Sequence, residues 1–393
     1  MYLARFRRLL EQRPSLGIPT VALYLLLRAA WIHRRVLAMV VVSAGMGLLF
    51  SSFPRPHYIA ISPSASPRKP TYLLTDLGTL NNQPGSGAAD INNKGQVVGW
   101  FGVQYRETHA FLWQNGIMRD LGAPHGTRSA ATALNDKGQI VGWSGSRQYT
   151  NCRAVLWGRK VQLLDSLPGC SFNEATDVNN NGVVCGTAFN ERQRARSTYH
   201  GFVWQRGRLT DIGTLPEDDE SAADGINDAG QVVGYSRWYN YFCAVRYENG
   251  QMCRLAGWGD GKTISASAIN RDGNVVGTSE ITRSRSYFQR ACLWKVGQEN
   301  TPIDLGTLGG GKSAANDINR KNQVVGWSYV VDDNREESAA FLWQHDVMYN
   351  LNDCIASDSG WVLCNATAIN DKGQIVGVGI ISGHTHAFLL TPK

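Results

Sequence analysis

The sequence predicts an all-β protein, a seven-bladed β-propeller built from four-stranded antiparallel blades. Three observations lead to this prediction. A pattern of small residues, Ile-Asn, Gly and Val-Val-Gly occurs seven times, and each repeat contains four short apolar runs bounded by turn residues. From Tyr72 onward, no segment keeps the 3.6-residue apolar period over the ten or more positions that a helix needs.

The spacing of the repeat supports this fold. Each copy contains one Asn at the start of a turn: Asn92, Asn135, Asn179, Asn227, Asn270, Asn319 and Asn370. The intervals are 43, 44, 48, 43, 49 and 51 residues, and antiparallel units of that length are typical of propeller blades. The alternative is an open β-solenoid, whose coils are usually shorter and parallel, so the antiparallel turn signals count against it.

The four strands of a unit differ in composition. The first ends in Ile-Asn or a variant, as in Ser129 to Asn135, and the second is β-branched, as in Gln139 to Trp143. The third resembles Ala110 to Trp113, and the fourth carries Asp-Leu-Gly, as at Asp120. Turns that begin with Asn and end with Gly, such as 135–138, predict tight hairpins between the first and second strands, and Asn-Gly turns do the same for the third and fourth.

The two ends of the repeat region complement each other. An Asp-Leu-Gly strand around Asp76 precedes the first Asn-Gly hairpin, and the last unit stops after Ala387 to Leu390 without a fourth strand. If the first strand fills that vacancy, the ring closes and no free edge remains. We therefore expect a closed ring in residues 72–393.

Five Trp residues occupy one repeated position in the third strand. Bulky side chains at such a position fill the space between neighbouring blades, so we expect them to be structural. They are Trp113, Trp157, Trp204, Trp294 and Trp343.

The amino-terminal part has a different character. Residues 1–53 form a basic leader that contains a fifteen-residue uncharged run, residues 36–50, directly after Arg34 and Arg35. Such a run suits a signal peptide or short anchor. A Pro- and Ser-rich linker, residues 54–71, follows. We expect an extracytoplasmic protein, periplasmic or secreted, that residues 36–50 anchor in the inner membrane unless they are cleaved.

The positive charge lies almost entirely in this leader. The formal net charge is +7, but residues 1–70 carry ten basic residues against one acid, and the remaining 323 residues carry 29 against 31. The repeat region is therefore close to neutral, and we expect no nucleic-acid partner.

The repeat words resemble those of a known family. Residues 304–310, 314–319 and 323–327, together with His109-Ala110-Phe111-Leu112-Trp113, are similar to the HAF-repeat family of bacterial, extracytoplasmic repeat proteins. The resemblance covers residues 72–390 and implies the compartment and repeat architecture, but no catalytic residues. The His recurs only at His200 and His386, which puts in doubt any role that needs it in every blade.

Two motifs suggest ligands but have better structural explanations. Residues 306–313 match the phosphate-loop pattern, yet the next residues begin a strand and not the helix whose amides would hold a phosphate. Residues 177–182 resemble part of a calcium loop, but sister loops place Lys or Ala where an oxygen ligand belongs. We expect no metal and no cofactor.

The eight Cys of an exported chain suggest disulfides. Two pairs bracket short segments and are the best candidates, Cys354 with Cys364 and Cys152 with Cys170. No Cys-x-x-Cys spacing occurs, so a zinc site is not expected.

The position of the variable segments gives the one argument about function. Connections from second to third strands, and from blade to blade, emerge on one face, and variable loops on a rigid scaffold usually carry binding. The long ones are residues 192–198, 237–241, 279–289 and 330–338. Aromatic residues at these strand ends suit sugars or peptides, and the candidate ligand-binding residues are Trp100, Trp143, Tyr235, Trp327 and Trp238.

Two functions remain open from the sequence. The first is a monomeric, non-catalytic binding protein whose partner is a carbohydrate or an envelope protein. The alternative is a polysaccharide hydrolase or lyase with its site in the propeller funnel, which needs two carboxylates within several ångströms. Residues 217–220 are four consecutive acids, a pattern more typical of a solvated surface.

Overall fold

The computed structural model describes residues 68–80, 83–103, 107–146, 151–190, 199–258, 264–283, 286–332 and 335–393. Residues 69–393 form one compact unit. The expected leader, the segment 36–50 and most of the linker lie outside the described residues. Within the described ranges, no helix has the length and apolar character that crossing a membrane requires.

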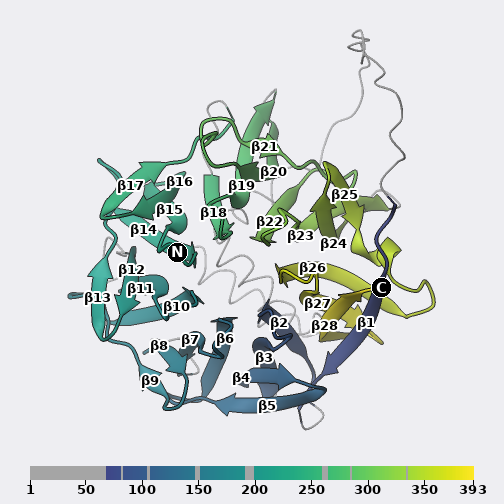
Figure 1. The fold of residues 1–393 in the computed structure, drawn as a ribbon, viewed down its shortest axis with the longest axis horizontal. Coiled ribbons are helices and arrows are strands. Elements are labelled where there is room, and N and C mark those ends of the chain that lie inside the picture. Colours follow the sequence, from purple (N-terminus) through teal and green to yellow (C-terminus); the bar gives the residue numbers. More distant parts are fainter. Residues whose placement is uncertain are drawn as a thin grey trace, which may run out of the picture. The chain divides into compact units, whose positions relative to one another are not determined.

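Seven four-stranded antiparallel sheets surround a central axis, as the repeat predicts (Figure 1). Within each blade we name the strands a to d, from the axis to the rim. Blade 1 contains β2 (Ser86–Ile91), β3 (Val97–Val103), β4 (Glu107–Gln114) and β5 (Ile117–Gly122). Blade 2 contains β6 (Arg128–Leu134), β7 (Ile140–Gly145), β8 (Arg153–Trp157) and β9 (Gln162–Leu163). Blade 3 contains β10 (Phe172–Val178), β11 (Val184–Phe189), β12 (Tyr199–Gln205) and β13 (Arg208–Asp211).

The remaining blades follow the same order. Blade 4 contains β14 (Glu220–Ile226), β15 (Val232–Trp238), β16 (Tyr241–Glu248) and β17 (Gln251–Arg254). Blade 5 contains β18 (Ile264–Ile269), β19 (Val275–Arg283), β20 (Ser286–Trp294) and β21 (Ile303–Asp304). Blade 6 contains β22 (Ser313–Ile318), β23 (Val324–Asp332), β24 (Arg335–Gln344) and β25 (Val347–Asn350), followed by the 3₁₀ turn η3 (Leu351–Cys354). Blade 7 contains β26 (Trp361–Ile369), β27 (Ile375–Ile381), β28 (His384–Pro392) and β1 (Tyr72–Gly78).

The ring closes as the sequence predicts. Strand β1 pairs antiparallel with β28, with Tyr72 opposite Pro392 and Asp76 opposite Phe388. Leu77 of β1 is buried in a cluster that also contains Phe111 of blade 1. The first strand of the repeat region therefore completes the last blade and packs against the first.

The glycine of each Val-Val-Gly word permits a close approach of strands a and b. In every blade the a–b pairing shifts register at a bulge, and this glycine lies beside it, as Gly99 does opposite Ala88. A Cβ at Gly99 would lie 2.0 Å from the carbonyl oxygen of Gly87, and the six equivalent glycines give 2.0 to 2.1 Å. A side chain there is incompatible with the bulged pairing, which explains why this letter recurs in all seven repeats.

The core lies between the blades. Most clusters of buried residues combine two neighbouring sheets, and the repeated Trp of strand c belongs to them, as expected. The indole N–H of Trp157 donates to the carbonyl oxygen of Leu121 in the preceding blade. The indole N–H of Trp294 in blade 5 donates to the carbonyl oxygen of Ala256, which lies in the connection from blade 4. These side chains stabilise the contact between adjacent sheets.

Candidate functional site

The ring has two faces, which we define by their connections. The turn face carries the a–b and c–d turns, and the loop face carries the b–c hairpins and the blade-to-blade connections, because successive strands are antiparallel. Two of the long loops expected on the loop face are instead extended strand pairs. Strands β19 and β20 pair as far as Arg283 and Ser286, and β23 and β24 pair as far as Asp332 and Arg335. Residues 192–198 lie outside the described residues.

Two of the five candidate aromatic residues are not on the surface. Trp100 is 3% exposed and Trp143 is 1% exposed, so the expected exposure of these two rings is wrong. The ring of Trp100 covers Gly87 of strand a, where an added Cβ would lie 2.6 Å from the indole nitrogen. In blade 2, Trp143 of strand b pairs with Ala130 of strand a. Small residues opposite leave room for the indoles to fold over strand a and fill the core.

Tyr235 and Trp327 are half-buried at the equivalent positions in blades 4 and 6. Tyr235 packs edge-on against Phe242 at 5.5 Å between ring centroids, and Trp327 packs against Tyr329 at 5.2 Å. Only part of each ring is accessible to solvent. These two residues therefore support the loop face more than they present a surface to a ligand.

Trp238 is the exposed member of the set, at the tip of the β15–β16 hairpin of blade 4. It is 56% exposed, and its ring stacks on Tyr241 with centroids 6.1 Å apart and planes at 21°. Tyr239, between them, is also exposed and has a positive φ of 54°. The tip thus places three aromatic side chains in solvent, a feature that folding alone does not explain.

An ion pair fixes the base of this hairpin. Arg237 pairs with Glu220 of strand a, and its guanidinium lies 5.6 Å from the ring of Phe242. Glu220 is buried, and Asp218 accepts a hydrogen bond from the hydroxyl of Ser236 at 2.6 Å. The acidic run 217–220 is therefore partly a structural anchor, although Glu217 and Asp219 are exposed as a solvated run would be. We call residues 237–241 the aromatic hairpin.

Three carboxyl groups face the axis of the ring. Asp90, Asp177 and Asp317 lie on the a strands of blades 1, 3 and 6, and each bridges two blades through both of its oxygens. Each accepts from the backbone N–H that follows it at 2.7 Å and from an N–H of the next blade at 2.8 Å. Sequence analysis did not identify them, although Asp directly before Ile-Asn or Val-Asn in three of seven repeats was visible.

The pKa values of these carboxyl groups are raised. Burial, then repulsion from Asp317 and Asp177, raises the pKa of Asp90 to about 8. Burial raises the pKa values of Asp177 and Asp317 to about 6, although their backbone hydrogen bonds oppose the shift. Because the charges act on one another across non-adjacent blades, the side chains share the space around the axis. Each of the three side chains is only partly exposed to solvent.

The His of the repeat has a structural partner at the rim. In blades 1, 3 and 7, His109, His200 and His386 contact the Asp of the Asp-Leu-Gly word in strand d at 2.8 to 3.0 Å. The same Asp accepts from the N–H of the following Gly, which has φ near +70°. In blade 5 Arg290 replaces the His and lies 3.9 Å from Asp304. The His therefore secures the end of strand d, a role that Arg can also fill.

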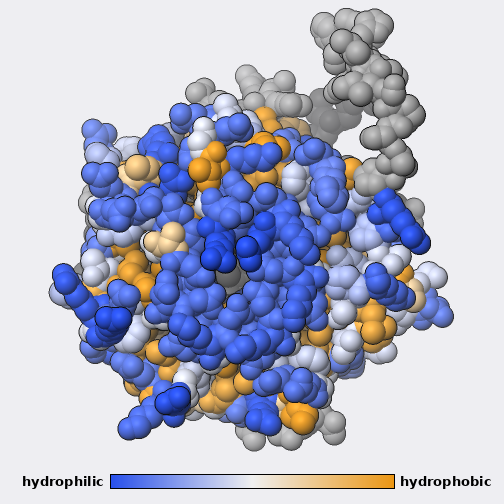
Figure 2. Space-filling model, viewed as in Figure 1, coloured by the Kyte–Doolittle hydropathy of each residue, from blue (hydrophilic) through white to orange (hydrophobic). Residues whose placement is uncertain are grey.

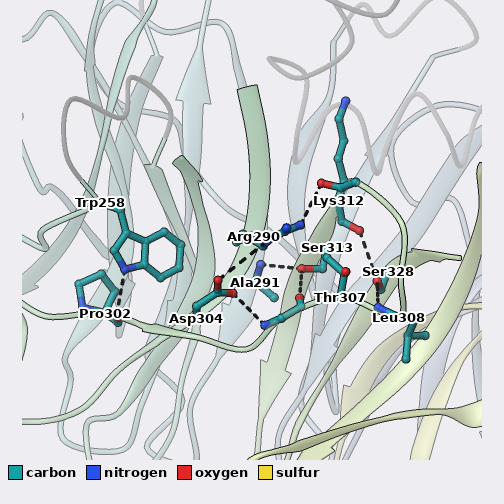
Figure 3. A network of polar contacts seen from close by, with 12 residues as sticks. Trp258, Arg290, Ala291, Pro302, Asp304, Thr307, Leu308, Lys312, Ser313 and Ser328 are labelled. Atoms are coloured by element: carbon teal, nitrogen blue, oxygen red, sulfur yellow. Dashed lines mark hydrogen bonds and ion pairs between the residues drawn. The ribbon is translucent and has the colours of Figure 1, made fainter. Parts of the chain in front are cut away.

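The phosphate-loop match is a connection between blades 5 and 6 (Figure 3). The hydroxyl of Ser313 donates to the carbonyl oxygen of Gly306 and accepts from the N–H of Ala291. Arg290 donates to the carbonyl oxygen of Gly311, and the side chain of Lys312 points away from this network. Strand β22 follows directly, so no helix amino terminus is present in this described segment. The structural explanation of the motif is confirmed.

The calcium-like segment is an a–b turn. Asn179 accepts from the N–H groups of Asn181 and Val183, both at 3.0 Å, and Asp177 caps two backbone N–H groups. Within the described part of the chain, no group of three or more His, Cys, Asp or Glu could hold a metal ion. The oxygens of this segment stabilise the turn.

The structure contains neither of the two predicted disulfides. Cys354 is buried in η3 with its sulfur on the carbonyl oxygen of Asn350, whereas the sulfur of Cys364 lies near Val362. Burial raises the pKa values of both thiols to about 11. Cys152 is buried beside Gly145, and Cys170 lies partly buried in a turn. Proximity in the sequence was misleading because each thiol faces a different environment.

Comparisons with known proteins add little beyond the fold. A family described as "Protein of unknown function (DUF3466)" matches residues 259–388, which include most of blades 5 to 7. No curated protein matches the sequence.

Among solved structures, the propeller domain of the trilobed protease from Pyrococcus furiosus is similar, with 10% identity and a TM-score of 0.50 over 78% of this chain and 94% of that one. TolB from Acinetobacter baumannii matches at 10% identity and a TM-score of 0.38 over 76% of this chain. The match spans only 63% of TolB, less than two thirds of its length. A lectin from Aleuria aurantia matches at 11% identity and a TM-score of 0.33, over 82% of this chain and 96% of the lectin. At these identities the comparisons show the propeller fold and leave function to the residues of this chain.

Proposed function

We propose that this protein is a non-catalytic binding propeller that holds carbohydrate on the aromatic hairpin of blade 4. The observation that carries the proposal is the stacked, exposed pair Trp238 and Tyr241. Aromatic faces pack against the apolar C–H faces of sugar rings, while the indole N–H and phenol O–H provide hydrogen bonds at the ring edge. Such a surface costs solubility unless it binds a partner.

The support beneath the hairpin favours a preformed site. The ion pair of Arg237 with Glu220 and the packing of Tyr235 on Phe242 fix the strands from which the tip emerges. A rigid aromatic pair loses little conformational entropy on binding, which raises affinity. The location that we propose, outside the cytoplasm, rests on the uncharged run 36–50 and on the resemblance to the HAF-repeat family.

A glycan array followed by calorimetry tests the proposal. Trp238→Ala is expected to weaken binding of the best glycan by about tenfold or more, because truncation of a Trp or Tyr that anchors a binding interface commonly costs about 2 kcal/mol or more. Ile117→Ala is a matched control, since Ile117 is also exposed and apolar but lies in strand d of blade 1. Unchanged affinity in Trp238→Ala, or an equal loss in Ile117→Ala, would refute this binding site.

The alternative is a polysaccharide hydrolase or lyase that uses the axial carboxyl groups. The observation in its favour is the pKa of Asp90, raised to about 8, because a general acid must be protonated near neutral pH. Against it, both oxygens of Asp90 already accept backbone hydrogen bonds. Turnover assays on the glycans that bind distinguish the two functions: turnover that is lost in Asp90→Asn favours the enzyme, and binding without turnover favours the binding protein.

A further inference from the structure

The centre of the turn face carries a circle of contacts. We call the seven Asn residues that begin the a–b turns, from Asn92 to Asn370, the ring Asn residues, and the contacts are formed by the residue that follows each of them. In five of the seven blade-to-blade steps, the backbone N–H of this residue donates to the side-chain oxygen of its equivalent in the next blade, at 2.8 to 3.0 Å. The five hydrogen bonds run from Asn93 to Asp136, Asp136 to Asn180, Asn180 to Asp228, Arg320 to Asp371 and Asp371 to Asn93. The capping oxygen always comes from an Asn or Asp.

The circle is interrupted at blades 5 and 6, where the equivalent residues are Arg271 and Arg320. An Arg side chain has five donors and no acceptor, so it cannot cap the N–H of the preceding blade. The backbone N–H groups of Asp228 and Arg271 therefore lack the partner that their equivalents have. Within the described ranges they form no other hydrogen bond with the protein.

The same two blades place positive charge at the rim of a cavity. The residues of all seven a–b turns line a depression of about 280 Å³ on the axis, and Arg271 and Arg320 are among them. Both side chains are exposed, and neither forms an ion pair with a described residue. Figure 2 shows that hydrophilic residues surround a central opening in the ring.

Among the described residues, the acidic residues of the circle form no ion pair with these cations, and their oxygens accept hydrogen bonds from neutral N–H groups instead. The two oxygens of Asp228 accept from the backbone and the side chain of Asn180, at 2.8 and 3.2 Å. Asp371 accepts from the backbone N–H of Arg320 and from the side chain of Asn93. Arg271 and Arg320 occupy equivalent positions on adjacent blades and line the same depression.

We propose that Arg271, Arg320 and the backbone N–H groups of Asp228 and Arg271 form a binding site for an oxyanion, the carboxylate or phosphate group of a small ligand. Two guanidinium groups and two amides would provide charge-assisted hydrogen bonds to several oxygens at once. The ligand's other polar atoms would meet the Asn and Asp side chains around the cavity. This site lies on the face opposite the aromatic hairpin and does not depend on the proposed function.

The circle itself suggests the variants that test this site. Arg271→Asn and Arg320→Asn each introduce the capping residue that blade 1 or blade 3 already has, so both proteins are expected to fold at least as stably as the wild type. Calorimetry with the full chain at low, fixed ionic strength would use inorganic phosphate and glucuronate as separate probes. At least one is expected to bind the wild type, and each variant is expected to bind it about tenfold or more weakly.

Lys321→Asn is the matched control, because it removes the same charge from the same turn as Arg320 but does not line the cavity. The affinity of Lys321→Asn for the probe is expected to stay within about twofold of the wild type, since an exposed charge outside the cavity contributes little. Binding of phosphate alone or of glucuronate alone supports the site and identifies the preferred oxyanion. The proposal is overturned if neither probe binds at millimolar concentration, or if Lys321→Asn weakens binding as much as Arg320→Asn.

Discussion

The side-chain amide of Asn370 donates to the carbonyl oxygen of Asn92, 278 residues earlier in the chain, at 3.0 Å. This hydrogen bond completes a circle in which every ring Asn donates to the next one, with all seven distances between 2.9 and 3.1 Å. Each Asn is buried, and its side-chain oxygen accepts from the N–H groups two and four residues later, as Asn92 does from Lys94 and Gln96. One residue type thus forms the turn of its own blade and links that turn to the next blade.

We expect Asn370→Ala to lower the free energy of unfolding by about 3 kcal/mol, because it removes several buried hydrogen bonds worth about 0.5–1.5 kcal/mol each. Asn370→Asp keeps the oxygen acceptor but loses the amide donor to Asn92 and Gln374 and places a buried carboxylate against their oxygens, so it should destabilise the protein at least as much as Asn370→Ala. Denaturant unfolding measures both changes. Lys372→Ala, an exposed position in the same turn, should change stability by less than about 0.5 kcal/mol; an equal effect would contradict the role of the circle.

Closure of the ring by β1 predicts a contrast between two leucines of that strand. Leu77 is 6% exposed and packs between blades 7 and 1, whereas Leu73 is 58% exposed. Leu77→Ala is expected to cost about 2–5 kcal/mol, the usual range for a buried leucine, and Leu73→Ala less than about 0.5 kcal/mol. Thermal and denaturant unfolding measure the difference. Similar losses in both variants would show that β1 is not tightly docked in solution.

The pair of His200 and Asp211 predicts a pH-dependent contribution to stability. The hydrogen bond with Asp211 raises the pKa of His200, although burial opposes the shift. Burial acts to raise the pKa of Asp211, but hydrogen bonds from His200 and from the Gly213 N–H lower it overall. A raised His pKa stabilises the fold below the unfolded value of about 6.5 and loses this effect as pH rises through the folded pKa.

Asp211→Asn should therefore destabilise the protein more at pH 5.5 than at pH 8.5. Asn can still accept from the N–H of Gly213 through its amide oxygen, so the turn is kept. We expect a small difference, below about 1 kcal/mol, because both side chains are partly exposed and solvent screens the pair. Unfolding curves at the two pH values provide the measurement, and equal destabilisation at both would disprove the charge–charge contribution.

The raised pKa of Asp90 predicts how the free energy of unfolding changes with pH. Its folded pKa of about 8 lies above the unfolded value, so the folded state binds more protons and stability falls as pH rises toward 8. In Asp90→Asn the fall in the free energy of unfolding between pH 6 and pH 9 should be smaller than in the wild type. Asp177 and Asp317 titrate mainly below this window, at about 6. Identical slopes in the two proteins would contradict a raised pKa for Asp90.

The repeat of seven Asn-turn words predicted the number of blades, their antiparallel strands and the closure near Asp76. These features depend on local turn chemistry and on spacing along the chain, which a sequence displays directly. The structural role of the repeated Trp residues followed in the same way from a shared strand position. The predicted exposure of Trp100 and Trp143 failed because it depends on the size of the residues opposite, Gly87 and Ala130, in another strand.

By itself, then, the sequence determined the architecture of this protein, because each blade is a local unit whose turns and strands are encoded within about 50 residues. Only the tertiary structure decided which polar groups meet: the circle of Asn amides, the axial carboxyl groups of Asp90, Asp177 and Asp317, and the interruption at Arg271 and Arg320. These contacts join residues of different blades, as Asn370 and Asn92 do. The physical reason is that a hydrogen bond requires its two atoms to lie within about 3.5 Å of each other in space. The separation of two residues along the chain does not reveal that distance.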